Sequence, residues 1–164
     1  MERNDFIAGP DDLILITGAT GFIGSRLVAN LVDRGFRNLR CLARPSSAAG
    51  RIAALAAAGN GLARVDLVRG NLLSREDCRA VTKDAAVILH LAAGRGEKSV
   101  PDAFLNSVVT TRNLMEASLG HRCLKRFVNV SSFSVYTNES APLDETCPVE
   151  DHPEARGDAA LAAE

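Results

Sequence analysis

The sequence is poor in the residues that mark several classes of protein. It has no tryptophan, one tyrosine and four cysteines, and no two cysteines form a C-x-x-C pair. A disulfide framework or a structural zinc site therefore has little support, and buried thiols in a reducing compartment are expected. No apolar run approaches the ~20 residues of a membrane-spanning helix, and the charged N-terminus lacks an apolar secretory core. We expect a soluble, cytoplasmic protein without a membrane partner.

Neither sign of charge is in excess. The 164 residues carry 19 Lys and Arg against 20 Asp and Glu, which gives a net charge of −1. No global field attracts nucleic acid, which is not an expected partner, so recognition of an anion has to be local. The length suits one domain that buries about two thirds of the surface exposed by its unfolded chain.

One glycine-rich stretch organises the rest of the chain. The apolar run 13–17 predicts a buried parallel strand, and Gly18, Gly21 and Gly24 follow it where a helical pattern begins. The first glycine allows a sharp turn, the second lets backbone amides approach a pyrophosphate, and the third allows close helix packing. The helix N-terminus then faces the anion. A helix that merely follows a glycine-rich turn is the plain alternative, and the strand-helix alternation that follows favours the phosphate cradle.

The remaining chain alternates between strand and helix patterns. Further strands are predicted at 39–43, 63–70, 85–93 and 126–130, and helices at 22–34, 48–58, 75–82 and 101–118. This order predicts an α/β fold with a doubly wound parallel sheet of about five strands in the order 3-2-1-4-5. We expect a tail over 1–10, a dinucleotide-binding domain over 11–136, and an irregular segment over 137–164 that ends in a short helix.

The end of the second strand bears on the choice of cofactor. An acidic residue ~20 residues past the glycines binds the ribose of NAD, whereas an arginine accommodates the extra phosphate of NADP. Here Arg44 is followed by Pro45, Ser46 and Ser47, with no acid. A guanidinium beside two hydroxyls suits a phosphate dianion, so NADP is the expected cofactor and NAD the alternative. A solvated surface arginine is the plain interpretation of the same residue.

The helix predicted over 101–118 carries three uncharged polar residues in one line. Asn106, Thr110 and Asn113 recur at i, i+4 and i+7. The pattern is equally compatible with a solvated face and with a stripe directed at the nicotinamide end of a cofactor. Both interpretations stay open here.

Three motifs in order resemble the extended short-chain dehydrogenase/reductases, the NAD(P)-dependent epimerase/dehydratase family. They are T-G-x-x-G-x-x-G at 17–24, H-L-A-A at 90–93 and S-S-x-x-V-Y at 131–136, and the resemblance covers about residues 12–136. It implies a nicotinamide dinucleotide as partner. The implied cofactor-binding residues are Gly18, Thr20, Gly21, Phe22, Ile23, Gly24, Arg44, Ser46, Asn71, Leu72, Leu91, Ala92, Ala93, Asn106 and Ser131.

The resemblance also implies roles at the adenine and at the substrate. Asn71 stands where relatives usually have aspartate, and its oxygen can still accept a hydrogen bond from the adenine amine. Ser132 would be the catalytic hydroxyl that holds and polarises a substrate oxygen. An ordinary strand-end hydroxyl is the alternative for that serine.

The family's proton-transfer pair, Tyr-x-x-x-Lys, is absent from the 164 residues. The single tyrosine is Tyr136, and Ser140 stands four residues later. By the resemblance, Ala160 and Glu164 would occupy the two positions. Alanine has no proton to move, and a carboxylate would raise the pKa of a phenol instead of lowering it. The sixth strand and the substrate domain of the family are also expected to be missing.

Three interpretations follow. The first is the cofactor-binding portion of an enzyme that transfers hydride on a nucleotide-sugar or related alcohol or carbonyl metabolite, inactive as written. The second is a non-catalytic NADP-binding or sensor module, and the third is a truncated product with a bare edge strand and no stable cofactor site. The first is favoured. Relatives commonly form a homodimer through the helix that corresponds to 101–118 and the tyrosine-bearing helix, and the second is largely missing here. The side of helix 101–118 that carries Phe104 and Val108 is therefore expected either to pair imperfectly with a second copy or to stay exposed.

Overall fold

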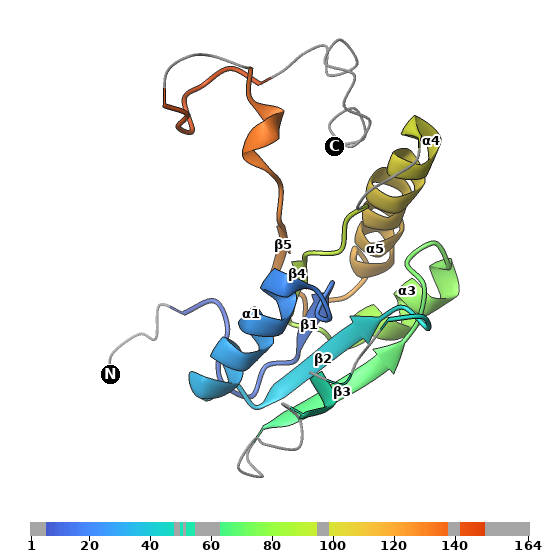
Figure 1. Cartoon of the computed structure of the whole chain (residues 1–164). Coiled ribbons are helices and arrows are strands. Elements are labelled where there is room, and N and C mark those ends of the chain that lie inside the picture. The colour runs from blue at the N-terminus through green and yellow to red at the C-terminus, as the bar shows by residue number, and fades with distance from the viewer. Residues whose placement is uncertain are drawn as a thin grey trace.

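The computed structural model describes residues 6–47, 50, 52–54, 63–94, 99–137 and 142–149. They contain a parallel five-stranded sheet in the order β3-β2-β1-β4-β5 (Figure 1). The strands are β1 (Ile14–Thr17), β2 (Asn38–Ala43), β3 (Arg64–Arg69), β4 (Val87–His90) and β5 (Arg126–Asn129). The helices are α1 (Phe22–Asp33), α3 (Arg75–Thr82), α4 (Val100–Ala103), η1 (Phe104–Val109), α5 (Thr110–Ser118) and η2 (Phe133–Val135). The predicted fold class and strand order are confirmed.

Alternate residues of the strands enter two apolar layers, one on each face of the sheet. Ile14 and Ile16 of β1 pack with Val28 of α1, whereas Leu15 between them packs with Leu114 of α5 and with residues of α3. All five side chains are at most 2% exposed. Because β1 is covered on both faces, its sequence is a continuous apolar run instead of an alternating one.

The fourth strand is shorter than its apolar run predicts. Residues 85–93 were expected to be extended, but β4 spans only Val87–His90 because its neighbour β1 offers four partners, Ile14–Thr17. Beyond His90, the amide of Leu91 still donates to the Thr17 carbonyl at 3.3 Å. The chain then leaves the sheet, and the residues that follow are available to line a cleft.

The predicted helix 101–118 has a π-helical middle. It begins as α4, widens into η1 and continues as α5. The hydroxyl of Thr110 donates to the carbonyl oxygens of Asn106 and Ser107, at 2.7 and 3.2 Å, where the helix returns to the α register. The cap predicted for α3 is present, since Ser74 Oγ accepts from the Asp77 amide at 3.1 Å.

The segments outside the sheet are only partly described. Pro10 accepts from the Arg37 amide at 2.7 Å, and Tyr136 forms an antiparallel bridge with Val149. The terminal helix expected over 159–164, with Ala160 and Glu164, lies outside the described residues. Of the helix expected over 48–58, the described residues 50 and 52–54 are helical. Within the described part of the chain, no helix is long and apolar enough to cross a membrane.

Candidate functional site

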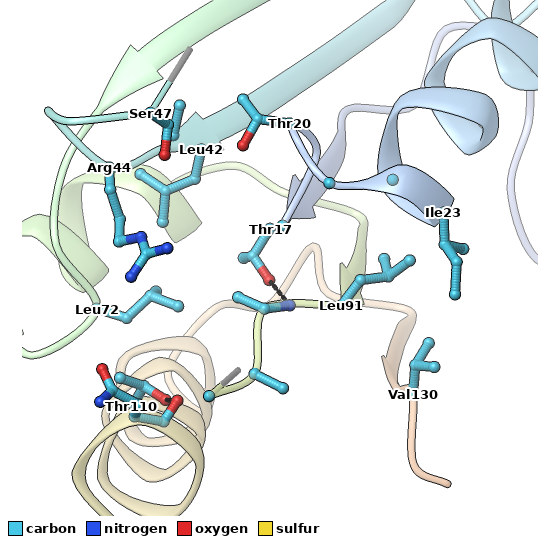
Figure 2. A pocket seen from close by; sticks show the side chains of 18 of the residues that line it. Thr17, Thr20, Ile23, Leu42, Arg44, Ser47, Leu72, Leu91, Thr110 and Val130 are labelled. Carbon is cyan, nitrogen blue, oxygen red and sulfur yellow. Dashed lines mark hydrogen bonds between the residues drawn. The ribbon is translucent and has the colours of Figure 1, made fainter. Parts of the chain in front are cut away.

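A cavity of about 630 Å³ opens at the carboxyl edge of the sheet (Figure 2). All five strands contribute through the residues at or just beyond their carboxyl ends, which include 17–18, 42–44, 70–72, 91–94 and 130. The N-terminal end of α1 and part of the η1–α5 helix complete the walls. The volume is typical of a small-molecule site, and open parallel sheets bind ligands at this edge.

Two glycines, one in the turn between β1 and α1 and one in the first turn of α1, leave no room for a side chain. Gly18 has a φ of +68°, and a Cβ placed on it would lie 2.7 Å from the Leu91 carbonyl carbon and 2.8 Å from the Ala92 nitrogen. A Cβ on Gly24 would overlap the Gly18 carbonyl oxygen and come within 2.8 Å of the Ala19 Cα. Glycine is therefore required twice, once for a left-handed backbone against β4 and once for helix packing.

The N-terminus of α1 presents unused donors to the cleft. Its N-cap is Gly21, which has no side chain to accept from the first amides, and no acidic residue stands in the first turn. The amides of Phe22, Ile23 and Gly24 donate to no other described residue. Three N–H groups at the positive end of a helix dipole fit a pyrophosphate.

A buried chain of hydrogen bonds fixes the loop after β4 against the turn. Thr17 Oγ1 accepts from the Ala92 amide at 3.2 Å, the bond drawn in Figure 2, and lies 2.6 Å from Nδ1 of His90. His90 Nε2 lies 2.9 Å from the hydroxyl of Thr111. Burial lowers the pKa of His90 to about 4, so the imidazole is neutral. The neutral ring carries its proton on one nitrogen, so the imidazole donates in one of these two contacts and accepts in the other.

Arg44 and Ser47 stand together at one side of the cleft. Figure 2 shows the Arg44 side chain reaching from the end of β2 toward Leu72, with Ser47 nearby. The Arg44 guanidinium forms no hydrogen bond or ion pair with the other described residues. No carboxylate is among the described residues that line the cavity. Among the described residues, this side of the cleft therefore offers a cation without a counter-ion.

The loop after β3 forms the neighbouring wall. Asn71 Oδ1 accepts from the Leu73 amide at 3.0 Å, and the Asn71 amide donates to Asp77 at 2.7 Å. One lone pair of the Asn71 oxygen is thus used within the loop, and the second is available for an adenine amine. Asn113 Nδ2 donates to the Leu72 carbonyl at 3.0 Å and holds the loop from α5.

The polar line on the helix is not a solvated face. Thr110 and Asn113 are each 6% exposed, and Asn106 and Thr110 line the cleft. Asn113 contacts the loop that the resemblance assigns to the adenine, so the line packs on that side of the site.

The structure gathers most of the predicted site residues. Three serines are the exceptions: Ser46 is exposed and outside the lining, Ser131 lines a second cavity of about 440 Å³ beside α5, and Ser132 lines neither. The other predicted residues line the cleft, namely Gly18, Thr20, Gly21, Phe22, Ile23, Gly24, Arg44, Asn71, Leu72, Leu91, Ala92, Ala93 and Asn106. Thr17, Ser47 and Thr110 also line it; they belong to the patterns named above but not to the predicted cofactor-binding residues. Lining residues that the sequence did not indicate are Leu42, Ala43, Gly70, Gly94 and Val130. Their common signal is position, since most directly end or follow a strand.

Comparison with known proteins identifies the family of the chain. The sequence pattern of the NAD dependent epimerase/dehydratase family matches residues 14–156. The chain belongs to this family. Proteins similar to the chain include cinnamoyl-CoA reductase 1 of Oryza sativa subsp. japonica, 32% identical over 151 residues, which are 89% of this chain and 43% of the reductase. UDP-glucose 4-epimerase 3 of the same plant is 31% identical over 135 residues, 75% of this chain and 35% of the epimerase.

A solved structure of a 4-epimerase is similar over most of the length of this chain. It is a UDP-glucuronic acid 4-epimerase from Bacillus cereus in complex with NAD, with a TM-score of 0.70 and 29% identity. The match covers 91% of this chain and 49% of the epimerase chain. The chain therefore spans less than half the length of these relatives, and it is an NAD(P)-binding portion of the epimerase/dehydratase fold.

Proposed function

We propose that this chain binds NADP in preference to NAD and forms the cofactor-binding portion of a family reductase, dehydratase or epimerase. The observation that carries the proposal is the cation at the end of β2. Arg44 lines the cleft beside Ser47, and no described carboxylate stands where a ribose hydroxyl would be bound. A 2′-phosphate would supply the counter-ion that Arg44 does not have among the described residues.

The residues of the cleft fit the rest of a dinucleotide. The amides of Phe22, Ile23 and Gly24 would hold the pyrophosphate, and the loop at Asn71 and Leu72 would border the adenine. The nicotinamide, when bound, would exchange hydride with a carbon of the substrate. The loop Leu91–Ala93 would close the ribose side, held in place by Thr17.

The substrate we propose is an alcohol or carbonyl centre of a nucleotide-sugar or a related metabolite. Support comes from the chemistry of the named relatives, which include a reductase and a 4-epimerase. Ser132, in the segment between β5 and η2, would hold the substrate oxygen. Because the 164 residues contain no Tyr-x-x-x-Lys pair, we propose that they do not turn over substrate alone.

The second candidate function is a non-catalytic NADP-binding or sensor module. One observation favours it, the combination of a well-formed cleft with the absence of the proton-transfer pair. This second candidate predicts the same NADP preference as the first. The nucleotide sequence downstream of the codon for Glu164 distinguishes the two, because a coding sequence that continues there favours the first candidate.

A homodimer is also proposed for this chain. Phe104, Leu105 and Met115 of the η1–α5 helix are 45–49% exposed, and their apolar surface would be covered by a second copy. Sedimentation velocity tests this directly, because Phe104→Lys should convert a dimer into a monomer. A wild-type monomer at 100 μM, a concentration on the order of a weak interface's Kd, would contradict it.

Calorimetric titration of NADP and NAD tests the cofactor proposal. We expect tighter binding of NADP, and Arg44→Asp should raise the NADP Kd about 30-fold, or about 2 kcal/mol, because it removes a charge-assisted contact. The NAD Kd should change much less. Arg34→Asp, the same charge change at the far end of α1, is the matched control. An unchanged NADP preference in Arg44→Asp would show that the arginine does not bind the 2′-phosphate.

A further inference from the structure

The turn that follows β2 is held by an arginine that does not line the cleft. The turn closes with the Ser47 amide donating to the Arg44 carbonyl at 2.9 Å. Arg69, the last residue of β3, donates from Nη1 to the carbonyl oxygens of Arg44 and Ser47, both at 2.9 Å. One guanidinium nitrogen therefore bridges the first and last residues of the turn.

The bridge starts from the sheet itself. Arg69 pairs with Ala43 in the register of β2 and β3, and the Gly70 amide donates to the Ala43 carbonyl at 3.1 Å. The side chain thus begins at a fixed point next to the residue that precedes the turn. Its two hydrogen bonds hold the backbone of Arg44 and Ser47, the two turn residues whose positions line the cleft.

The positive charge of Arg69 also affects the turn that follows β2. A cation bound to two carbonyl oxygens offsets their partial negative charge, which would otherwise oppose a nearby phosphate dianion. The acid on the same strand does not cancel this charge, because Asp66 is paired with Arg64 at 2.7 Å. Arg44 and Arg69 together leave this corner of the cleft positive.

We propose that Arg69 is a positioning residue for the 2′-phosphate of NADP: by bridging the carbonyls of Arg44 and Ser47, it holds the turn in the form that receives the phosphate. The inference rests on the proposed NADP preference and adds a residue to it. A merely structural arginine would affect NADP and NAD alike, because the two differ only in that phosphate. Substitution of Arg69 should therefore raise the Kd of NADP and leave the Kd of NAD nearly unchanged.

The experiment compares the two dinucleotides by calorimetry on the 164-residue chain. Arg69→Met should raise the NADP Kd about tenfold, the scale of hydrogen bonds to a charged group, and change the NAD Kd less than about twofold. Arg69→Lys, which keeps a cation and several donors, should recover most of the NADP affinity. Arg79→Met is the matched control, an exposed arginine of α3 that does not line the cleft, and should leave both constants unchanged.

The outcomes separate this inference from the proposed function. If Arg44→Asp removes the NADP preference but Arg69→Met does not weaken NADP, Arg69 has no positioning role and the proposed function stands. If the wild type shows no NADP preference, the proposed function itself fails. Equal weakening of NADP and NAD by Arg69→Met would also overturn the inference. Should Arg69→Met fail to fold, Arg69→Gln keeps a neutral donor and is judged by the same two constants.

Discussion

The carboxyl edge of the sheet has two contrasting regions, the turn after β1 and the segment after β5. In the first, Thr17 and Gly24 are buried, and the Gly18 backbone lies directly against Leu91. In the second, Val130 is 48% exposed and Phe133 75% exposed, and among the described strands β5 pairs only with β4. The turn after β1 is therefore held by contacts among the described residues, whereas the segment after β5 is largely exposed.

The largest effect is expected at the buried turn. Gly24→Ala would drive a methyl group into the Gly18 carbonyl oxygen, so α1 has to shift relative to the turn and to the proposed pyrophosphate site. We expect a loss of about 3 kcal/mol in the free energy of unfolding, the upper part of the range for overpacking. Dinucleotide binding should be lost with it. Urea unfolding and calorimetry measure both.

The control for that change is another glycine. A Cβ on Gly120 meets no atom within 4 Å, so Gly120→Ala should leave stability and binding near the wild-type values. If Gly24→Ala behaves like Gly120→Ala, the packing account of the turn is wrong.

A nearly equal loss in the free energy of unfolding is expected when the pH is lowered. The pKa of buried His90 is lowered to about 4, below the usual value of about 6.5 in the unfolded chain, so unfolding takes up a proton between these values. The stabilising contribution is complete above about pH 6.5 and should fall by about 3 kcal/mol as the pH drops to about 4. His90→Asn cannot titrate and keeps an acceptor for Thr17, so its unfolding free energy should fall less over that interval. Equal pH slopes would contradict the assignment.

A smaller effect separates binding from stability. Thr17→Val removes the oxygen that accepts from the partly buried Ala92 amide and leaves the buried Nδ1 of His90 without its partner, at a cost of about 2 kcal/mol. Because the loop after β4 lines the cleft, the dinucleotide Kd should rise about tenfold, and Thr17→Ser should restore it.

The matched control is Thr82, which is equally buried and lies at the end of α3. Its hydroxyl donates to the Cys78 carbonyl at 2.8 Å, away from the cleft. Thr82→Val should lower stability without changing the Kd. A change in Kd as large as that of Thr17→Val would mean that the Thr17 effect is only general destabilisation.

Local patterns explain why the fold and the turn could be predicted. An apolar run followed by spaced glycines specifies a buried strand, a left-handed turn and a helix start within a dozen residues. The choice between Ser46 and Ser47 could not be predicted, because the turn is fixed by Arg69, which lies 22 residues beyond Ser47. The π-helical segment has no local signal, and the role of Asn113 depends on a carbonyl 41 residues away. Contacts distant in sequence therefore decided the outcomes at Ser47 and Asn113.

The smallest expected effect belongs to the segment after β5. Ser132 does not line the cleft, so Ser132→Ala should leave the NADP Kd within about twofold of wild type. Ser47→Ala, the same change at a serine that lines the cleft beside Arg44, should raise it about fivefold through loss of one hydrogen bond to the phosphate. Calorimetry on the two variants compares the regions directly. A larger effect at Ser132 than at Ser47 would mean that the segment after β5 contributes to cofactor binding, and that the contrast between the two regions is wrong.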